Sequence, residues 1–260
     1  MNRLTQKLQQ LKQQQQSGLV CYFTAGDPDF SASVDLFSQL GTAGADIIEI
    51  GVAFSDPVAD GEVIQAAHAR ALNAGQTVAK TVELLRAVRE KDTKTPMVLM
   101  TYLNPILQYG IEKLAAETEN ILDAILIVDA PLEYQAQFKS VLGAKNIQCI
   151  SMAAPTTPAP RLKQIAAQAE GFLYYVSATG LTGGSLEIAQ LEKRLEQIKP
   201  VFDVPVAVGF GIKNQAQIQA LNHKADLVIV GSALVETFAQ QGLAATLAQV
   251  QDFASALKKP

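Results

Sequence analysis

One acidic residue in the sequence occupies an unusual place, inside a segment with the pattern of a buried strand. Glu49 lies in the run DIIEIGV, where strand alternation puts its side chain on the same face as Ile47 and Gly51. Burial disfavours a charged carboxylate and raises its pKa, which suits a group that exchanges protons near neutral pH. A glutamate paired with an arginine or with backbone donors is the structural alternative. We predict that Glu49 is a catalytic acid–base group.

A second acidic group follows in the segment Ala53–Gly61, which reads AFSDPVADG. Asp56 precedes a proline, an arrangement typical of a turn in which the carboxylate binds backbone N–H groups. Asp60 precedes a glycine and the helix-like run Val63–Ala71. An N-terminal cap and a catalytic role are therefore about equally favoured for Asp60 by the residue types alone.

The elements that must position these acids form a regular alternation along the chain. Short β-branched or aliphatic runs alternate with longer segments of helical periodicity. The predicted strands are Leu19–Thr24, Asp46–Val52, Met97–Thr101, Ala124–Val128, Ile147–Ser151, Phe172–Ser177, Val206–Val208 and Asp226–Gly231. The predicted helices between and after them include Ser31–Thr42, Thr77–Lys91, Leu132–Leu142, Pro160–Ala169, Ile188–Lys199, Gln215–Leu221 and Leu243–Leu257.

This alternation predicts βα units and a parallel sheet. Eight units without a long linker favour closure into a single (β/α)8 TIM barrel, a fold of roughly 250 residues, with residues 1–260 as one domain. An open, doubly wound sheet is the alternative. An extra amphipathic helix is expected within residues 1–16, where Leu4, Leu8 and Leu11 have helical spacing and can cap one end of the core.

Three glycine-rich turns follow late strands of the predicted barrel: Gly180–Gly184, Gly209–Gly211 and Gly231–Ser232. Glycine lets backbone N–H groups approach an anion closely, and barrels often bind phosphate in the loops after strands seven and eight. Each turn alone is weak support, because most glycine turns are only turns. Together they predict a phosphorylated substrate.

Composition excludes several other classes of function. The net charge is −4, with acids and bases interspersed, so neither a nucleic-acid surface nor a polybasic membrane patch is expected. His68 and His223 are far apart and have no ligand-spaced neighbours, so no metal site is expected. Cys21 and Cys149 form no CxxC pair and are expected to be reduced. With no signal peptide and no apolar run long enough to span a bilayer, a cytoplasmic location is predicted.

The segment IIEIGVAFSDPVADG (47–61) resembles the signature of tryptophan synthase α subunits. Further motifs similar to those of the family occur in the family's order and cover essentially the whole predicted barrel. They are TAGDPD (24–29), VLMTYLNPI (98–106), APTTPAPR (154–161), YYVSATGLTG (174–183), VAVGFGI (206–212) and VIVGSALV (228–235).

The resemblance implies retro-aldol cleavage of indole-3-glycerol phosphate to indole and glyceraldehyde 3-phosphate, without a metal or an organic cofactor. It implies that Glu49 is the acid–base group at indole C3 and at the glycerol hydroxyl, and that Asp60 stabilises positive charge at the indole nitrogen. It also places the indole and loop contacts on Tyr22, Met100, Tyr102, Leu126, Asp129, Tyr174 and Thr182, and the phosphate contacts on Gly183, Gly211, Gly231 and Ser232.

A partner is implied as well: a pyridoxal-phosphate-dependent β subunit in an α2β2 complex. Ala53 and Glu62 stand where the family usually has prolines, and both changes should loosen the Asp60 loop. A free-standing lyase with the same chemistry is one alternative. A weakly active barrel that mainly activates a β subunit is another, and phosphate-binding barrels such as sugar-phosphate isomerases are a more distant one.

Overall fold

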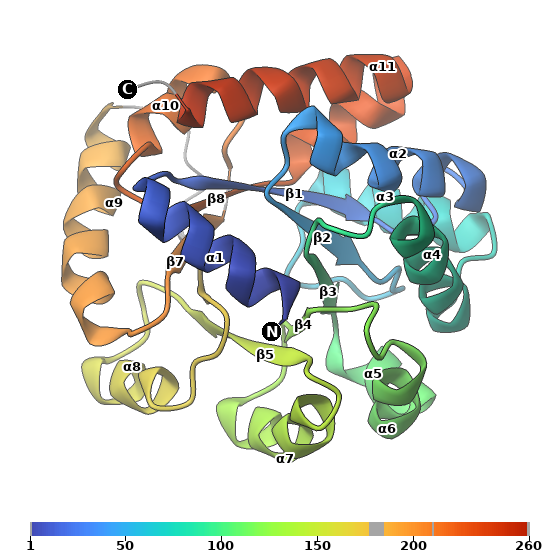
Figure 1. The fold of residues 1–260 in the computed structure, drawn as a ribbon, viewed down its shortest axis with the longest axis horizontal. Helices are drawn as coiled ribbons and strands as arrows, with labels where there is room; N and C mark the ends of the chain where they lie inside the picture. Colours follow the sequence, from blue (N-terminus) through green and yellow to red (C-terminus); the bar gives the residue numbers. More distant parts are fainter. Residues whose placement is uncertain (1, 177–184, 210, 259–260) are drawn as a thin grey trace.

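The chain folds around a closed barrel of parallel strands, as Figure 1 shows. The structure is a computed structural model and describes residues 2–176, 185–209 and 211–258, apart from the side chains of residues 185–188. Within these residues each strand pairs with its neighbours in sequence, and β8 pairs with β1. The strands are β1 Gly18–Thr24, β2 Ile47–Gly51, β3 Met97–Thr101, β4 Ala124–Ile127, β5 Gln148–Ala153, β6 Leu173–Val176, β7 Val206–Gly209 and β8 Leu227–Val230.

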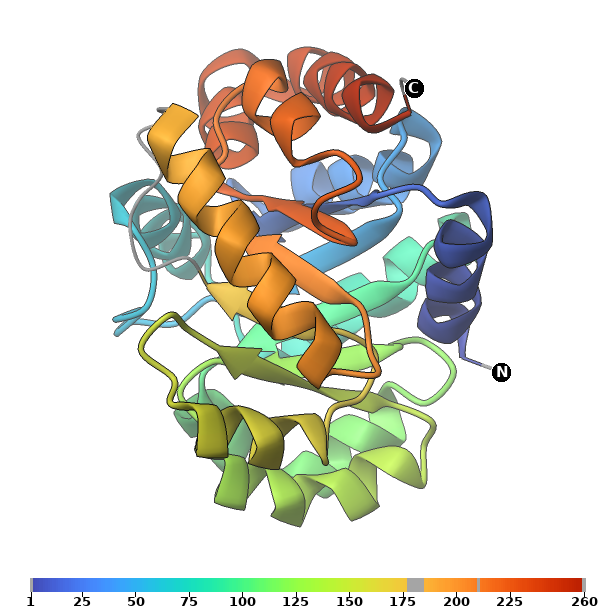
Figure 2. The same cartoon turned by 90° about the vertical axis from the view of Figure 1, so that its left-hand side faces the viewer.

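The predicted (β/α)8 TIM barrel is therefore confirmed, and the open doubly wound sheet is excluded by the β1–β8 pairing. Strand positions agree with the sequence prediction to within one or two residues at most ends. The helices of the described residues surround the barrel (Figures 1 and 2). They are α1 Arg3–Gln14, α2 Phe30–Ala43, α3 Glu62–Asn73, α4 Val78–Lys91, α5 Leu103–Tyr109, α6 Ile111–Glu117, α7 Leu132–Gly143, α8 Ala159–Ala166, α9 Ser185–Ile198, the 3-10 turn η1 Lys199–Val201, α10 Gln215–Leu221 and α11 Ser232–Leu257.

Helical structure extends further than the sequence pattern indicated in two places. The pair α5 and α6 was not predicted, because each helix is only seven residues long and a proline lies within α5. The last helix begins at Ser232 rather than Leu243, with a kink at Gly242, where φ is 76°. The predicted helix Leu243–Leu257 is the part of α11 that follows this kink.

The barrel interior consists of alternate strand residues, and α1 closes the end at which the strands begin (Figure 2). Leu4, Leu8 and Leu11 are buried against the inward residues of the strands, which confirms the predicted capping helix. Ile47 belongs to this interior cluster. Since side chains two positions apart share a face, Glu49 also points into the barrel, one layer nearer the end at which the strands finish.

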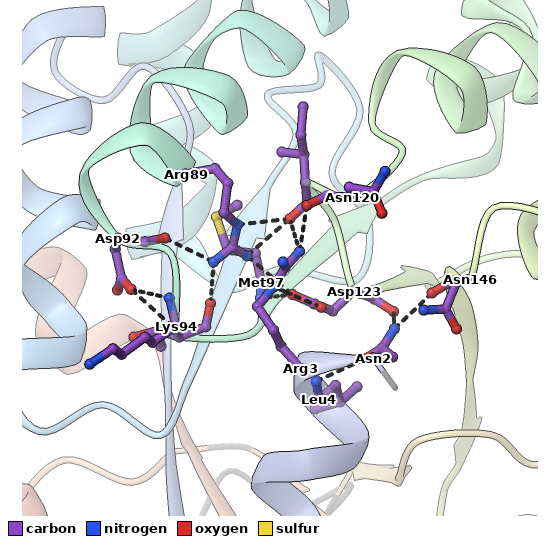
Figure 3. Close-up of polar contacts among 12 residues, drawn as sticks. Asn2, Arg3, Leu4, Arg89, Asp92, Lys94, Met97, Asn120, Asp123 and Asn146 are labelled. Carbon is purple, nitrogen blue, oxygen red and sulfur yellow. Dashed lines mark hydrogen bonds and ion pairs between the residues drawn. The ribbon is translucent and has the colours of Figure 1, made fainter.

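A largely buried network of ion pairs and hydrogen bonds holds α1 against the end of the barrel at which the strands begin (Figure 3). The Asp123 carboxylate accepts hydrogen bonds from Met97 N–H at 2.9 Å, from Arg89 Nη2 at 3.1 Å and from Arg3 Nε at 3.2 Å. Asn2 donates from Nδ2 to the Asp123 carbonyl at 2.8 Å and caps α1 by accepting from a backbone N–H. Burial, followed by the neighbouring Arg3, lowers the pKa of Arg89 to about 10. The network therefore joins α1, α4, β3 and the start of β4.

Candidate active site

The strands carry five of the predicted site residues to the same end of the barrel. Tyr22, Glu49, Met100, Leu126 and Tyr174 lie on β1, β2, β3, β4 and β6. Tyr22 is in register with Glu49, and Met100 is in register with Leu126, so these side chains are lateral neighbours. The structure thus brings together residues that are far apart in the sequence, at the end where (β/α)8 barrels place their active sites.

Two glycines make room for the two tyrosines of this group. A Cβ atom at Gly51 would lie 2.2 Å from the hydroxyl oxygen of Tyr22, and one at Gly209 would lie 2.7 Å from that of Tyr174. Each tyrosine therefore extends over the last residue of the adjacent strand, where a larger residue would not fit. Gly209 begins one of the predicted phosphate turns, and its lack of a side chain leaves room for the Tyr174 ring; the phosphate role of that turn stays a prediction.

The Glu49 carboxyl is buried without a hydrogen bond or an ion pair from the described residues around it. Its side chain is 1% exposed, and neither carboxylate oxygen has a hydrogen-bond partner among the described residues. Burial, followed by repulsion from Asp60, raises the pKa of Glu49 from 4.5 to about 8. The structural alternative, a glutamate neutralised by an arginine or by backbone donors, is not present in the described part of the chain. A carboxyl in this state holds a proton at neutral pH and can transfer it.

Asp60 lies on the loop that follows β2, and its side chain is turned inward rather than toward solvent. The Tyr102 hydroxyl donates to Asp60 Oδ2 at 2.7 Å and accepts from Ala59 N–H at 2.9 Å. Gly61, rather than Asp60, precedes the first turn of α3, and that end has no side-chain cap. Of the two roles that the sequence left open, the structure therefore does not support the N-terminal cap. The charge of Asp60 contributes to the raised pKa of both Glu49 and Tyr174, so its carboxylate lies near these two side chains at the mouth of the barrel.

His68 of α3 is a further residue of this region, and no motif in the sequence indicated it. Its Nδ1 accepts from Phe54 N–H at 3.1 Å, and its Nε2 lies 3.4 Å from Asp60 Oδ2. The side chain is almost completely buried. No role for it was apparent from the sequence, because the spacing of its neighbours indicated only that it does not bind a metal. The signal in the sequence was its position eight residues after Asp60, on the inner side of α3.

Asp129 and Met100 lie at the edge of the same region. The Asp129 carboxylate accepts from Leu103 N–H at 2.7 Å and so fixes the first turn of α5, next to Tyr102. Its predicted role in contacting substrate stays a prediction, as does that of the half-buried Met100. Thr182 and Gly183, two more predicted contacts, lie outside the described residues.

The predicted phosphate contacts that are described lie after β7 and β8. Gly231 precedes α11, and Ser232 is the first residue of that helix, so the N–H groups of Ser232 and Ala233 have no acceptor within the helix, whereas that of Leu234 donates to the Gly231 carbonyl. Gly211 has a φ of 72°, a conformation that favours glycine. A Cβ atom at Gly231 would lie 3.4 Å from the Tyr22 ring, which places this helix start beside the tyrosine and Glu49. The arrangement suits an anion, although the assignment to phosphate stays a prediction.

Other kinds of site are not seen in the described part of the chain. No group of three or more His, Cys, Asp and Glu side chains is placed to hold a metal ion there. Among the helices that the structure describes, none has the length and apolar character needed to cross a membrane.

Fold and site together define a (β/α)8 barrel with a buried, acid-bearing mouth next to a helix start that can receive an anion. The chain belongs to the tryptophan synthase alpha chain family, whose family model matches residues 8–259. It is 40% identical to a tryptophan synthase alpha chain of Acinetobacter baumannii, over 99% of this chain and 98% of the relative.

Solved structures support the same family. The fold is similar to that of tryptophan synthase subunit alpha from Legionella pneumophila, with a TM-score of 0.92, 37% identity and coverage of 99% of this chain and 98% of the other. It is also similar to a chain of Mycobacterium tuberculosis tryptophan synthase, with a TM-score of 0.91, 31% identity and coverage of 100% and 99%. The resemblance stated from the sequence motifs is therefore confirmed.

Proposed function

We propose that this chain is a lyase that cleaves indole-3-glycerol phosphate to indole and glyceraldehyde 3-phosphate. The observation that carries the proposal is the buried Glu49 carboxyl, which has no hydrogen-bond partner among the described residues and has Asp60 as its charged neighbour. Membership of the tryptophan synthase alpha chain family supports this reaction.

The reaction needs one proton to be added and another to be removed. Protonated Glu49 donates to indole C3, which creates positive charge that extends to the indole nitrogen. The ionised Asp60 carboxylate stabilises this charge. Glu49, now a carboxylate, removes the proton of the glycerol hydroxyl next to the breaking bond, and the C–C bond electrons neutralise the indole ring. Aldehyde and indole are released with Glu49 protonated again, so the cycle needs no other reactant.

The unlike surroundings of the two carboxyls support these separate roles. Glu49 is surrounded by apolar and aromatic groups, which favour its protonated form. Asp60 receives a hydrogen bond from the Tyr102 hydroxyl at 2.7 Å, which holds its carboxylate in place on the loop. Two carboxyls in such different surroundings can serve as a proton donor and an electrostatic stabiliser in one site.

The test is indole release by the purified chain and by its Glu49→Gln variant. Glutamine has the shape of glutamic acid but cannot supply the proton, so cleavage should be abolished while the barrel remains folded. Glu62→Gln is the matched control, because Glu62 is exposed on the first turn of α3 and the same substitution there should leave turnover unchanged. Near-normal turnover by Glu49→Gln would exclude this mechanism.

We further propose that the chain works with a β subunit, in an α2β2 complex that receives its indole. Exposed apolar side chains support a docking surface at the mouth. Val58, Leu107 and Tyr134 are 83%, 51% and 39% exposed, and they follow β2, β3 and β4, which are adjacent strands. Apolar residues gathered around an opening are typical of an interface with another protein.

Indole release with and without a β subunit discriminates among the alternatives. Low turnover that rises strongly on mixing supports the complex, high turnover alone supports a free-standing lyase, and no indole in either case supports a purely activating barrel. Leu107→Asp should reduce the stimulation. Val201→Asp is its control, because Val201 is also exposed but precedes β7 and so lies at the opposite end of the barrel.

We also propose that the chain acts in the cytoplasm. Its two cysteines, Cys21 on β1 and Cys149 on β5, are free and buried, as expected for a protein of a reducing compartment.

A further inference from the structure

A single imidazole ring joins the two ends of the loop that carries Asp60. The loop runs from the end of β2 to the start of α3, and His68 lies on the second turn of α3. Its Nδ1 accepts from Phe54 N–H at 3.1 Å, near the beginning of the loop. Its Nε2 lies 3.4 Å from Asp60 Oδ2, near the end of the loop.

The bond to Phe54 determines where the imidazole carries its proton. A backbone N–H only donates, so Nδ1 must offer its lone pair, and a neutral ring then has its hydrogen on Nε2. That hydrogen belongs to the nitrogen that faces Asp60. The Phe54 backbone therefore orients His68 as a donor toward the Asp60 carboxylate.

The Nε2–H group of His68 lies close to the Asp60 carboxylate but does not form a hydrogen bond with it. Its distance of 3.4 Å from Asp60 Oδ2 exceeds the usual N–H···O range of about 2.7–3.2 Å, and Nε2 has no hydrogen-bond partner among the described residues. The ring is 2% exposed, so water does not replace the missing partner easily. A buried donor without an acceptor is unfavourable, which indicates that another arrangement of the loop satisfies it.

Tyr102 supports Asp60 from the other side of the loop. Its hydroxyl bonds Asp60 Oδ2 at 2.7 Å and Ala59 N–H at 2.9 Å, and its ring lies 5.2 Å from that of Phe54, centroid to centroid. Phe54 and Asp60 are thus each contacted by both Tyr102 and His68. The loop is held at its two ends by one aromatic side chain from the strand side and one from the helix side.

We propose that His68 is a positioning residue, which donates from Nε2 to the Asp60 carboxylate when the loop closes over an indolyl substrate and so fixes that carboxylate opposite the indole nitrogen. This inference rests on the proposed function and adds to it a residue with no direct contact to substrate. A closed loop shortens the Nε2–Oδ2 distance, and the second donor joins Tyr102 in holding the charged oxygen. Closure of the loop therefore also fixes the negative charge of Asp60 where the reaction needs it, opposite the indole nitrogen.

Two substitutions separate the two nitrogens of the ring. Asparagine places an amide at about the position of Nδ1, so His68→Asn keeps an acceptor for Phe54 N–H but does not reach Asp60. Glutamine places its amide nitrogen at about the position of Nε2, so His68→Gln keeps the donor for Asp60. Arg70→Gln is the structural control, because it removes the paired 2.7 Å bonds to Asp27 from the same helix without touching Asp60.

The experiment measures kcat and KM for indole release, and the melting temperature, of the four proteins. We expect His68→Asn to lower kcat about 10- to 100-fold, as the loss of a hydrogen bond to a charged group would, with a smaller change in KM. His68→Gln should recover most of this loss. Arg70→Gln should lower the melting temperature with little effect on kcat. Equal kcat for His68→Asn and wild type, or equal losses in both His68 variants that follow their melting temperatures, would overturn the proposal.

A spectroscopic measurement covers the case in which both His68 variants fold poorly. The 15N signals of His68 in the wild-type chain should show hydrogen on Nε2 alone, and an indolylalkyl phosphate that lacks the reactive hydroxyl should strengthen the hydrogen bond of that N–H. No response of the Nε2–H signal to this ligand when it is bound would refute the inference. Failure of the proposed function is seen separately, as an absence of indole release from the wild-type chain.

Discussion

Replacing Glu49 with glutamine should change how the stability of the barrel depends on pH. The pKa of Glu49 is 4.5 in an ordinary setting and about 8 in the folded chain. Between these values the unfolded chain has released this proton and the folded chain has kept it. Stability is thus fully present below pH 4.5 and is lost as the pH rises through 8, by about 1.4 kcal/mol for each pH unit.

The size of this effect is large relative to the stability of a domain. The full loss across the window is about 5 kcal/mol, and about 70% of it has occurred by pH 7. Single domains are stable by only about 5–15 kcal/mol. Glutamine does not titrate, so the variant lacks this dependence, and the cost of burying its amide is constant with pH. The free energy of unfolding of Glu49→Gln should therefore rise relative to that of the native chain from pH 5 to pH 8.

Urea unfolding of both proteins at intervals between pH 5 and pH 9 measures this difference. The difference should level off above pH 8, where Glu49 is ionised in both the folded and the unfolded chain. Glu62→Gln again serves as a control, because this exposed side chain should give no such rise. A difference between Glu49→Gln and the native chain that is flat across the whole range would mean that Glu49 is ionised inside the barrel, and the proton-donor role would be refuted.

Three other substitutions test the surroundings of this carboxyl and the opposite end of the barrel. Asp60→Asn removes the repulsion that raises the pKa of Glu49, so the 13C carboxyl titration of Glu49 should move to lower pH; an unchanged midpoint would contradict the electrostatic coupling of the pair. Tyr102→Phe removes the 2.7 Å bond to Asp60, and kcat/KM for indole release should fall about 10- to 100-fold, whereas unaltered kinetics would show that the hydroxyl does not position the acid. Asp123→Asn leaves the buried Arg89 without its anion and should lower the free energy of unfolding by about 3–5 kcal/mol while the folded fraction keeps its turnover; a melting temperature equal to that of the native chain would disprove the anchoring role.

The parts of the fold that depend on local periodicity were predictable from the sequence. Strand positions, the leucines of α1 and the inward direction of Glu49 all follow from spacing along one element. The pair α5 and α6 was missed because two seven-residue helices contain too few turns to show a periodic pattern. The start of α11 was missed for another reason, since Gly242 interrupts the pattern while the helix direction continues on both sides of it.

The sequence was enough to name candidate site residues, but not the contacts that they make. Motifs indicated Glu49 and Asp60, yet the sequence left open whether Asp60 capped a helix or faced a substrate. The structure disfavours the cap, because Tyr102, which directly follows β3, binds the Asp60 carboxylate and Gly61 precedes α3; the substrate role of Asp60 stays a prediction. His68 was not recognised because its importance depends on two contacts, to Phe54 and Asp60, that only the folding of α3 against the loop creates.

The distribution of paired and unpaired charge points to the same candidate site without reference to any motif. The Asp, Glu, Arg and His side chains that are buried in the described part of the chain are Asp27, Glu49, His68, Arg89 and Asp123. Three of them are neutralised within the protein: Asp27 by Arg70, and Arg89 and Asp123 by each other.

Glu49 and the Nε2 of His68 are the buried ionisable groups of this set that have no hydrogen bond from the described residues, and both face the same mouth. Such groups lower stability by about 1–3 kcal/mol each, so folding does not explain their presence. The network around Asp123 and the buried leucines of α1 stabilise the opposite end of the barrel. This stability offsets the free-energy cost of the unpaired groups at the mouth. On the reaction and the loop closure proposed above, Glu49 finds its partner in a bound indolyl glycerol phosphate, which accepts its proton, and the Nε2 of His68 finds its partner in the Asp60 carboxylate.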